Sequence, residues 1–172
     1  ESESDIINIP SNTTIVGNGN VIINVKYNDI AIKNSLFVEG NERITISGFK
    51  VNVLYDDSPY NKHLIYFRNV NNCLIEKLTI TCEGTQGIYN DYIPPTEQYA
   101  AILLYSSGEN NNCINNIIRQ CYIYDYGKDV GTSPNIAYNY GFGICLSGIA
   151  CSNNIVKNNY ISGCLDGIFL MD

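Results

Sequence analysis

A short apolar pattern recurs four times along the chain and limits the folds that the chain can adopt. Each copy reads as an apolar residue, two variable residues, a small or apolar residue, one variable residue and a second apolar residue. A second apolar segment precedes each copy, a fifth such segment starts at Gly167, and residues 14–23 read as an earlier, degenerate copy. Self-similarity of this kind predicts a repeat architecture. The four copies occupy residues 43–51, 74–80, 117–123 and 155–161, and the segments before them occupy residues 36–38, 64–67, 101–105 and 142–146.

One copy contains two or three short strands, which are too few to bury an apolar face alone. Stacked copies bury one another, because each strand pairs in parallel with its equivalent in the next copy, about 4.8 Å away. Equivalent residues then form columns, and the final residues Val51, Ile80, Ile123 and Ile161 are expected to form one of them. An inward Asn is tolerable at a corner if its amide bonds to neighbouring backbone or to a stacked amide. The pattern therefore predicts a solenoid with a continuous core.

The composition supports this prediction. The 172 residues include 26 Ile, 25 Asn and 14 Gly, but only 10 Leu and 5 Ala. Ile suits a pleated sheet, whereas Asn and Gly suit tight turns with left-handed backbone. No long segment carries apolar residues at helical spacing, so we expect almost no α-helix.

The repeats differ in length, and the extra residues fall mostly in one place. They lie between the end of one copy and the next short strand, at residues 55–63, 83–99 and 125–141. Insertions that leave a solenoid from one edge build a binding face. Random drift of surface loops is the alternative, but drift would scatter insertions among all corners.

The run at residues 151–170, Cys-Ser-Asn-Asn-Ile-Val-Lys-Asn-Asn-Tyr-Ile-Ser-Gly-Cys-Leu-Asp-Gly-Ile-Phe-Leu, resembles the repeat of right-handed parallel β-helix proteins. These are the pectin-lyase-like superfamily and proteins with NosD-type repeats. The opening Thr-Ile-Val-Gly-Asn-Gly-Asn at residues 14–20 is similar to their first-coil segment. The resemblance covers roughly residues 14–172 and implies an extended polysaccharide groove beside one parallel sheet. Its members include pectate lyases, polygalacturonases, alginate-modifying enzymes, phage tailspike depolymerases and non-catalytic adhesins.

We therefore expect an all-β chain that forms one right-handed parallel β-helix of about five to six coils, with long loops on one edge. Residues 1–172 are expected to be a single domain. No polar cap is visible at either end of the repeat, which indicates a fragment of a longer solenoid or a chain whose ends other subunits cover.

Cleavage of a polysaccharide needs carboxylates, as an acid and base pair or as a base with a cation. If Ile65, Ile102 and Ile144 point inward, alternation directs their neighbours on the short strands outward. That outward set is aromatic and apolar, and its only charges, Glu39 and Arg68, could simply pair. The outward set comprises Phe37, Glu39, Tyr66, Arg68, Leu103, Tyr105, Cys145, Ser147, Phe169 and Met171.

Two acids elsewhere remain candidate catalytic residues. Asp166 lies in an Asp-Gly-Ile element that partly matches the catalytic element of polygalacturonase-like enzymes, although the rest of that signature is absent. Asp125 lies in Tyr-Asp-Tyr-Gly at the start of a long insertion. The alternative for both is a turn residue that bonds local backbone or solvent.

Tyrosines mark the insertions more clearly than acids do. Eight of the 14 Tyr lie in or beside the insertions. A Tyr ring offers a flat apolar face and a hydroxyl, which suits stacking on sugar rings, although such rings can equally pack loops onto the solenoid. The candidate substrate-binding residues are Tyr66, Arg68, Tyr89, Tyr92, Tyr99, Tyr105 and Tyr126.

No cofactor or metal is expected. The seven cysteines form no Cys-x-x-Cys pair, and His63 is the only histidine, so the sequence predicts no zinc site. The cysteines read as small buried residues, and their redox state stays open. Gly17-Asn18-Gly19 reads as a turn and not as a phosphate loop.

The net charge and the hydropathy of the chain limit the kinds of partner that it can bind. A net charge of −7 argues against a nucleic-acid partner, and no apolar run reaches the length of a membrane span. The first functional hypothesis is an extracellular, cell-surface or virion module that binds or degrades a polysaccharide. The second is a non-catalytic adhesin or assembly subunit, and a homotrimer or larger assembly is compatible with either.

Overall fold

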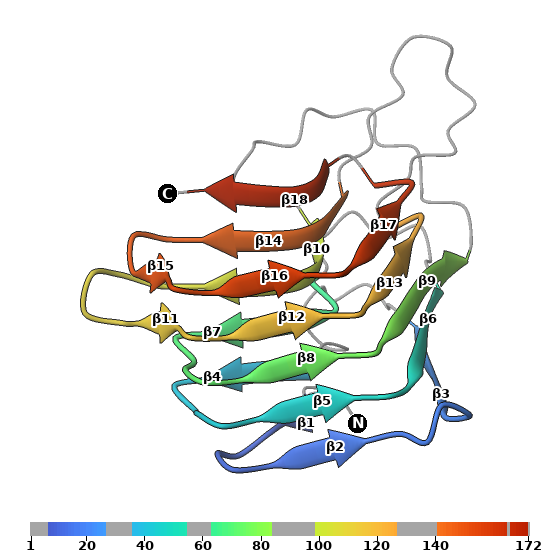
Figure 1. Cartoon of the computed structure of the whole chain (residues 1–172), viewed down its shortest axis with the longest axis horizontal. Helices are drawn as coiled ribbons and strands as arrows, with labels where there is room; N and C mark the ends of the chain where they lie inside the picture. The colour runs from blue at the N-terminus through green and yellow to red at the C-terminus, as the bar shows by residue number, and fades with distance from the viewer. Residues whose placement is uncertain are drawn as a thin grey trace, which may run out of the picture.

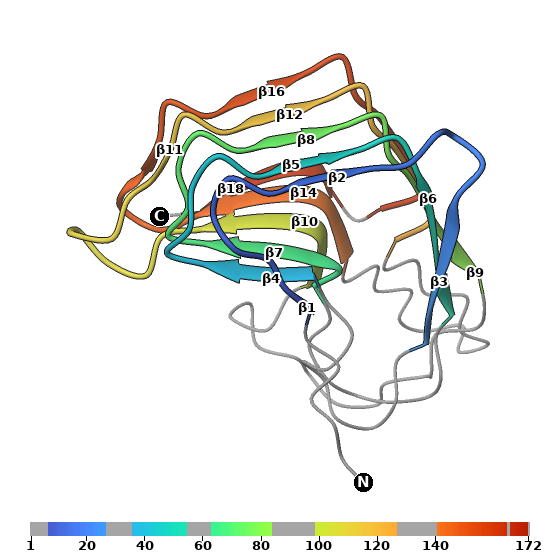
Figure 2. The ribbon, with the colours of Figure 1, turned by 90° about the horizontal axis from the view of Figure 1, so that it is seen from below.

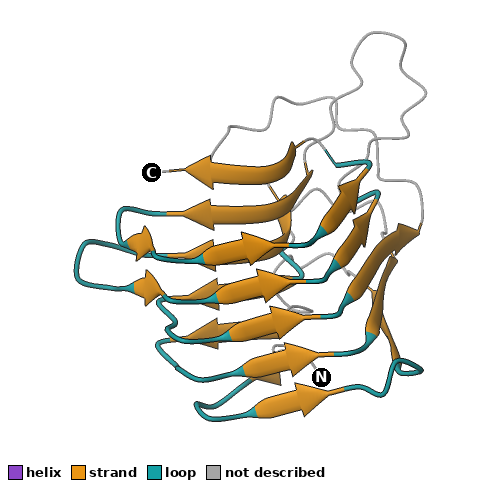
Figure 3. Ribbon diagram, in the orientation of Figure 1, coloured by secondary structure: helices purple, strands orange, loops and turns teal. Residues whose placement is uncertain are grey.

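The computed structural model describes residues 7–26, 36–54, 63–83, 99–126, 141–164 and 166–171. This part of the chain contains strands and no helix, so the expected all-β class is confirmed (Figure 3). It accordingly contains no helix long and apolar enough to cross a membrane.

The strands form three larger sheets and one short one. The first sheet contains β1 (Ile7–Asn8), β4 (Leu36–Glu39), β7 (Ile65–Arg68), β10 (Tyr99–Tyr105), β14 (Gly141–Ser147) and β18 (Asp166–Met171). The second sheet contains β2 (Thr14–Val16), β5 (Thr45–Ser47), β8 (Leu74–Glu76), β12 (Ile117–Arg119) and β16 (Ile155–Lys157). The third sheet contains β3 (Ile22–Lys26), β6 (Lys50–Leu54), β9 (Thr79–Glu83), β13 (Tyr122–Tyr124) and β17 (Tyr160–Ser162). The short sheet pairs β11 (Cys113–Ile114) with β15 (Cys151–Ser152).

The chain visits the three larger sheets in turn, so consecutive strands such as β7, β8 and β9 make up one layer. Layers stack on one another, and every strand pairing among the described residues is parallel (Figure 1). The second sheet lies opposite the first, and the third runs along one side (Figure 2). Parallel stacking of equivalent strands is the arrangement that the sequence pattern predicts.

Equivalent apolar residues stack in register, as expected. Val51 pairs with Ile80, Ile80 with Ile123, and Ile123 with Ile161. Residues 14–23 continue the columns, since Ile23 pairs with Val51. Buried members of all three sheets belong to one apolar cluster between the sheets, in which Val51, Ile80 and Ile123 have at most 2% of their surface exposed.

Asparagine fixes one corner between the first and second sheets. Asn12, Asn72, Asn115 and Asn153 have positive φ angles of 55° to 62° and occupy equivalent positions. Arg43 takes the remaining equivalent position at φ 56°. Asn tolerates this left-handed conformation better than other residues with a side chain, which explains its abundance.

A second Asn column lies inside the same corner. The Asn116 side chain is 1% exposed, accepts a hydrogen bond from the Cys73 backbone N–H at 2.9 Å and donates to the Val70 carbonyl at 3.0 Å. It also donates to Asn154 Oδ1 at 3.0 Å. The expected stacked-amide arrangement is therefore present.

The register also determines which residue lies opposite Cys73. Asn71-Asn72-Cys73 resembles the start of the next copy at Asn112-Cys113, but Asn71 pairs with Ile114, which places Cys73 opposite Asn116. Cys113 instead pairs with Cys151. Backbone conformation decides the alignment, because the left-handed residue Asn72 must stack on Asn115.

The long insertions join the same two sheets. Residues 27–35, 55–62, 84–98 and 127–140 each connect the end of a third-sheet strand to the start of a first-sheet strand, and they lie outside the described residues. Only residues 163–165 separate β17 from β18. The ends of the insertions thus converge on one corner of the stack, beside the first sheet.

Candidate functional site

The candidate site is the outer face of the first sheet, which the chain joins after each insertion. Its centre is a second apolar cluster, separate from the core, made of Ala100, Leu103, Phe142 and Cys145. Tyr66, Tyr105 and Phe169 pack against this cluster from around it. Leu103 and Cys145 therefore face outward, as alternation predicts.

A bend at the start of the first-sheet strands interrupts the alternation. Leu64 and Ile65 both belong to the core, and so do Ala101 and Ile102 one layer further along. Two consecutive inward residues place the preceding position on the outer side, where Ala100 and Phe142 lie. Asp166 pairs with Phe142 and is exposed, so the same bend brings it to this face.

Tyrosine and arginine side chains border one side of the face. The ring centroids of Tyr66 and Tyr105 lie 6.3 Å apart, and the Arg68 guanidinium carbon lies 5.9 Å from the centroid of Tyr105. Arg68 Nε lies 3.3 Å from a Glu39 carboxylate oxygen, so the two charges pair across adjacent strands. Burial raises the pKa of Tyr66, and the neighbouring Arg68 charge opposes this shift. At neutral pH this edge therefore presents the protonated Tyr66 phenol and a paired cation.

The centre of the face is less accessible than the sequence indicates. Leu103 is 7% exposed and Cys145 is 4% exposed, whereas Tyr66 and Tyr105 are partly exposed. Phe142 and Phe169 stack with centroids 4.3 Å apart and planes 5° from parallel. A ligand would accordingly contact the tyrosines and Arg68 and not the buried apolar centre.

His63 lies at the same face, and sequence reasoning did not include it. Its ring centroid is 5.3 Å from that of Tyr66, and its Nδ1 accepts a hydrogen bond from the Ala100 backbone N–H at 3.1 Å. Burial lowers the pKa of His63 to about 4, so the ring is neutral at pH 7. No sequence signal marked His63 as a site residue, because the bend that brings it to this face was not predictable.

The two candidate catalytic acids both follow third-sheet strands, at the corner where the chain turns to the first sheet. Asp125 follows β13 with φ 54° and donates its backbone N–H to the Ser162 carbonyl at 2.9 Å. Its carboxylate lies against Gly163, since a Cβ on that glycine would come 2.1 Å from Asp125 Oδ1. Asp166 begins β18, three residues after Gly163. This geometry places Asp125 at a turn, and both Asp125 and Asp166 are exposed.

The remaining candidate residues differ in their positions. Tyr126 has no exposed surface and belongs to the core, so its ring cannot stack on a sugar, and the binding role expected for it is withdrawn. Tyr99 is the first residue of β10, and its side chain is outside the description. Tyr89 and Tyr92 lie outside the described residues.

The described part of the chain contains no group of three or more His, Cys, Asp or Glu that could hold a metal ion. Six described cysteines are free thiols. Cys113 pairs in register with Cys151, and its hydrogen bond to Cys151, together with burial, raises the pKa of Cys113. Five of these thiols lie in or against the core as small apolar groups, and Cys145 lies in the outer-face cluster of the first sheet.

No family model, no curated protein and no solved structure matches the chain.

Proposed function

We propose that the chain is an extracellular, cell-surface or virion module that binds or degrades a polysaccharide. In this proposal the stacked layers are the five to six coils of a right-handed parallel β-helix, and residues 1–172 form one domain. The repeat resembles that of the pectin-lyase-like superfamily, whose members place an extended glycan beside one parallel sheet. The single observation that carries the proposal is the set of partly exposed aromatic side chains on the outer face of the first sheet, beside the corner where the insertions return.

Tyr66, Tyr105 and Arg68 are the proposed binding residues. Aromatic rings offer flat apolar surfaces to sugar rings, and a phenol or guanidinium bonds to hydroxyl or carboxylate oxygens. Tyr89, Tyr92 and Tyr99 remain predicted contributors from the insertions.

Asp166 is the proposed catalytic acid or base, with Asp125 as its partner. Hydrolysis of a glycosidic bond needs two carboxyl groups flanking the bond. Asp166 is exposed at the aromatic face, and Asp125 lies one layer below Gly163, close to the same corner.

Depolymerisation of a panel of acidic polysaccharides tests the proposal. Release of new chain ends by the wild-type chain would support degradation, and loss of that activity in Asp125→Asn or Asp166→Asn would support the proposed roles. Unchanged activity in both variants would remove these residues from the mechanism. Binding without cleavage, lost in Tyr66→Ala/Tyr105→Ala, would support a binding module.

A non-catalytic adhesin or assembly subunit is the second candidate. It is favoured by the apolar and aromatic character of the outer face of the first sheet, where Tyr66, Tyr105 and Phe169 surround an apolar cluster. A stable trimer or filament in light scattering, with no effect on any polysaccharide, would favour this alternative.

A further inference from the structure

We propose that Cys113 and Cys151 form a modification site, at which a small-molecule disulfide such as oxidised glutathione links two layers of the stack through a disulfide bond. The inference goes beyond the proposed function, because it concerns how the layers are held together and requires no glycan. The bond joins β11 to β15, the two strands of the short sheet, which lie side by side at one edge of the stack (Figure 1).

The two cysteines lie directly opposite each other. Cys113 and Cys151 pair in register on parallel strands, so their Cα atoms are about 4.8 Å apart. Disulfide-bonded residues have Cα atoms about 4.4–6.8 Å apart, and the spacing of the strands falls within this range. Cys113 belongs to the apolar core and Cys151 packs against the same core. Both side chains therefore point to the inner side of the corner, where the Cys113 thiol is hydrogen-bonded to Cys151.

This pairing distinguishes Cys113 and Cys151 from the other cysteines. Among the strand pairings of the described residues, no other joins two cysteines. Cys82 pairs with Val53, and Cys145 pairs with Leu103 on one side and with Phe169 on the other. The register therefore selects one pair of thiols for the bond.

Hydrogen bonds to the two sulfur atoms determine which thiol reacts first. Asn154 Nδ2 lies 3.4 Å from Cys151 Sγ, and Asn116 Nδ2 lies 3.6 Å from Cys113 Sγ. The Cys113 thiol donates to Cys151, which lowers the pKa of Cys151 and raises the pKa of Cys113. Two donors on one sulfur favour the thiolate, which is the nucleophile in thiol–disulfide exchange. Cys151 is also partly exposed, whereas Cys113 has no exposed surface. Cys151 is therefore the thiol that meets the oxidant.

The bond forms in two exchange steps. The Cys151 thiolate attacks one sulfur of oxidised glutathione, forms a mixed disulfide and releases the first glutathione as a thiolate. Cys113 then loses its proton, and its sulfur attacks Cys151 Sγ and releases the second glutathione. The two protons of the protein thiols end on the two glutathione thiolates. Two protein thiols are thus oxidised to one disulfide, and one glutathione disulfide is reduced to two thiols.

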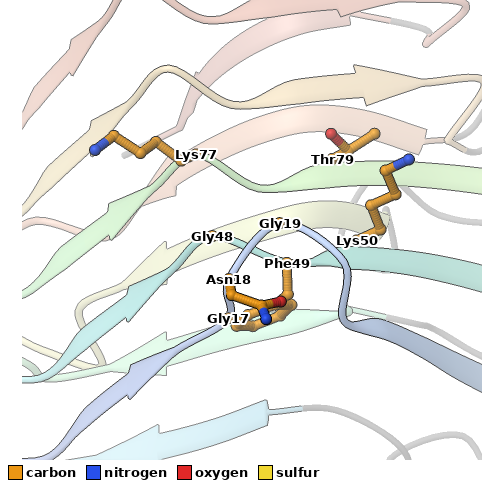
Figure 4. Close-up of a pocket in the computed structure, with 8 residues that line it drawn as sticks. All are labelled: Gly17, Asn18, Gly19, Gly48, Phe49, Lys50, Lys77 and Thr79. Atoms are coloured by element: carbon orange, nitrogen blue, oxygen red, sulfur yellow. The ribbon is translucent and has the colours of Figure 1, made fainter.

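The corner between β11 and β15 has room for this bond. At another corner, between the second and third sheets, Gly17 and Gly48 approach so closely that a Cβ on Gly17 would lie 2.6 Å from the Gly48 carbonyl oxygen (Figure 4). The β11 and β15 corner instead holds two side chains whose thiols are in contact. The Cβ atoms of a disulfide lie about 3.5–4.5 Å apart, so the two strands need to approach by up to about 1 Å. Each strand is only two residues long, and few ladder hydrogen bonds oppose this movement.

The bond should stabilise the last layers of the described stack. It closes a loop between residues 113 and 151, which contains β12, β13, the insertion at residues 127–140 and most of the connection from β14 to β15. Closure of a loop reduces the freedom of the unfolded chain. We therefore expect the urea midpoint of the oxidised chain to exceed that of the reduced chain by about 1–2 M.

Oxidation of the whole folded chain with glutathione disulfide tests the inference. After alkylation of the remaining thiols and proteolysis, mass spectrometry should find the peptides of Cys113 and Cys151 joined and all other cysteines alkylated. Cys151→Ala should abolish the difference in urea midpoint between the oxidised and reduced chains. Cys145→Ala is the matched control, because Cys145 is buried on the adjacent β14 and has no cysteine opposite it. This variant should form the bond and show the difference in midpoint that the wild type shows.

Circular dichroism establishes that each variant is folded, and if Cys151→Ala is not, Cys151→Ser and the linked peptides of the wild type decide the outcome. A glutathione adduct on Cys151 that never gives way to the linked peptides would overturn the inference, because Cys113 would then be out of reach. Linkage of another pair in the folded chain, linkage of Cys113 to Cys151 only in denaturing urea, or equal midpoints of the two redox forms would also overturn it. None of these results bears on glycan binding, so the proposed function is tested separately.

Discussion

Replacement of Asn116 by alanine is expected to destabilise the fold strongly, although it removes no apolar contact of the main core. The side chain is 1% exposed and satisfies two buried backbone groups on the neighbouring layer, the N–H of Cys73 and the carbonyl of Val70. The stacked Asn154 Oδ1 loses one of two donors, since it still accepts from the Asn116 backbone N–H at 2.9 Å.

The magnitude follows from the two backbone groups that lose their partner. A buried polar group left without a hydrogen bond costs about 1–3 kcal/mol, so the variant should lose about 2–6 kcal/mol of unfolding free energy. Denaturation in urea measures the loss. With a slope of about 2 kcal/mol per molar urea, the midpoint should fall by about 1–3 M.

Asn112→Ala is the control, because Asn112 lies just before β11, four residues from Asn116, and is exposed. A surface change of this kind should alter the unfolding free energy by less than about 0.5 kcal/mol. If Asn116→Ala shifted the midpoint no more than Asn112→Ala, the amide would not hold the layers together, and the reasoning would be wrong.

Three further predictions concern the backbone, the histidine and the thiols. Gly148→Ala should lower the unfolding free energy by about 3 kcal/mol or more in the same urea assay, because the φ of Gly148 is 96° and a Cβ would come 2.1 Å from the Ser106 carbonyl oxygen. An unchanged unfolding free energy would contradict the corner geometry. The His63 pKa of about 4 in the folded chain lies below the unfolded value of 6.5, so the unfolded chain binds a proton more readily than the folded chain does. The unfolding free energy should therefore decrease as pH falls from 6.5 to 4, by at most about 3 kcal/mol. The difference in unfolding free energy between wild type and His63→Gln should not change with pH above pH 7. Burial raises the pKa of Cys121 to about 11 and of Cys145 to about 12, so at pH 8 both should react with a chromogenic disulfide reagent only after denaturation, and rapid labelling of the native chain would refute their burial.

The stacking of the repeats was predictable because parallel in-register strands bring equivalent residues together. Identical or similar apolar residues then recur at the same position, and Ile80, Ile123 and Ile161 showed this without any structure. The corner asparagines recur at equivalent positions because few side chains tolerate positive φ, so they were predictable as well.

The candidate site was less accessible to sequence reasoning. Alternation correctly directed Leu103 and Cys145 outward, but it contains no information on what covers a face, and both side chains are buried. The bend before Ile102 also reverses the expected side of Ala100, because two consecutive residues turn into the core. Such a bend arises from packing between sheets and leaves no pattern in the local sequence.

The exposed tyrosines of the third sheet were predictable from the sequence. Tyr122 and Tyr124 flank the inward Ile123, so alternation alone places both rings outside. Neither ring was predicted to be a binding residue, because tyrosine is common in strands for its packing alone. The register that places Tyr122 beside Thr79 and Tyr160 required the structure.

Distances between isoleucine methyl groups test the stacked arrangement most directly. In a chain with labelled Ile and Val methyl groups, assigned by single substitutions, nuclear Overhauser effects should connect Val51 to Ile80, Ile80 to Ile123, and Ile123 to Ile161. Partners in register on strands about 4.8 Å apart are within range of this measurement. Observation of this series would establish the parallel layers on which both proposals depend. Its absence, with Ile123 instead close to residues of its own sequence neighbourhood only, would contradict the stacking and both proposals with it.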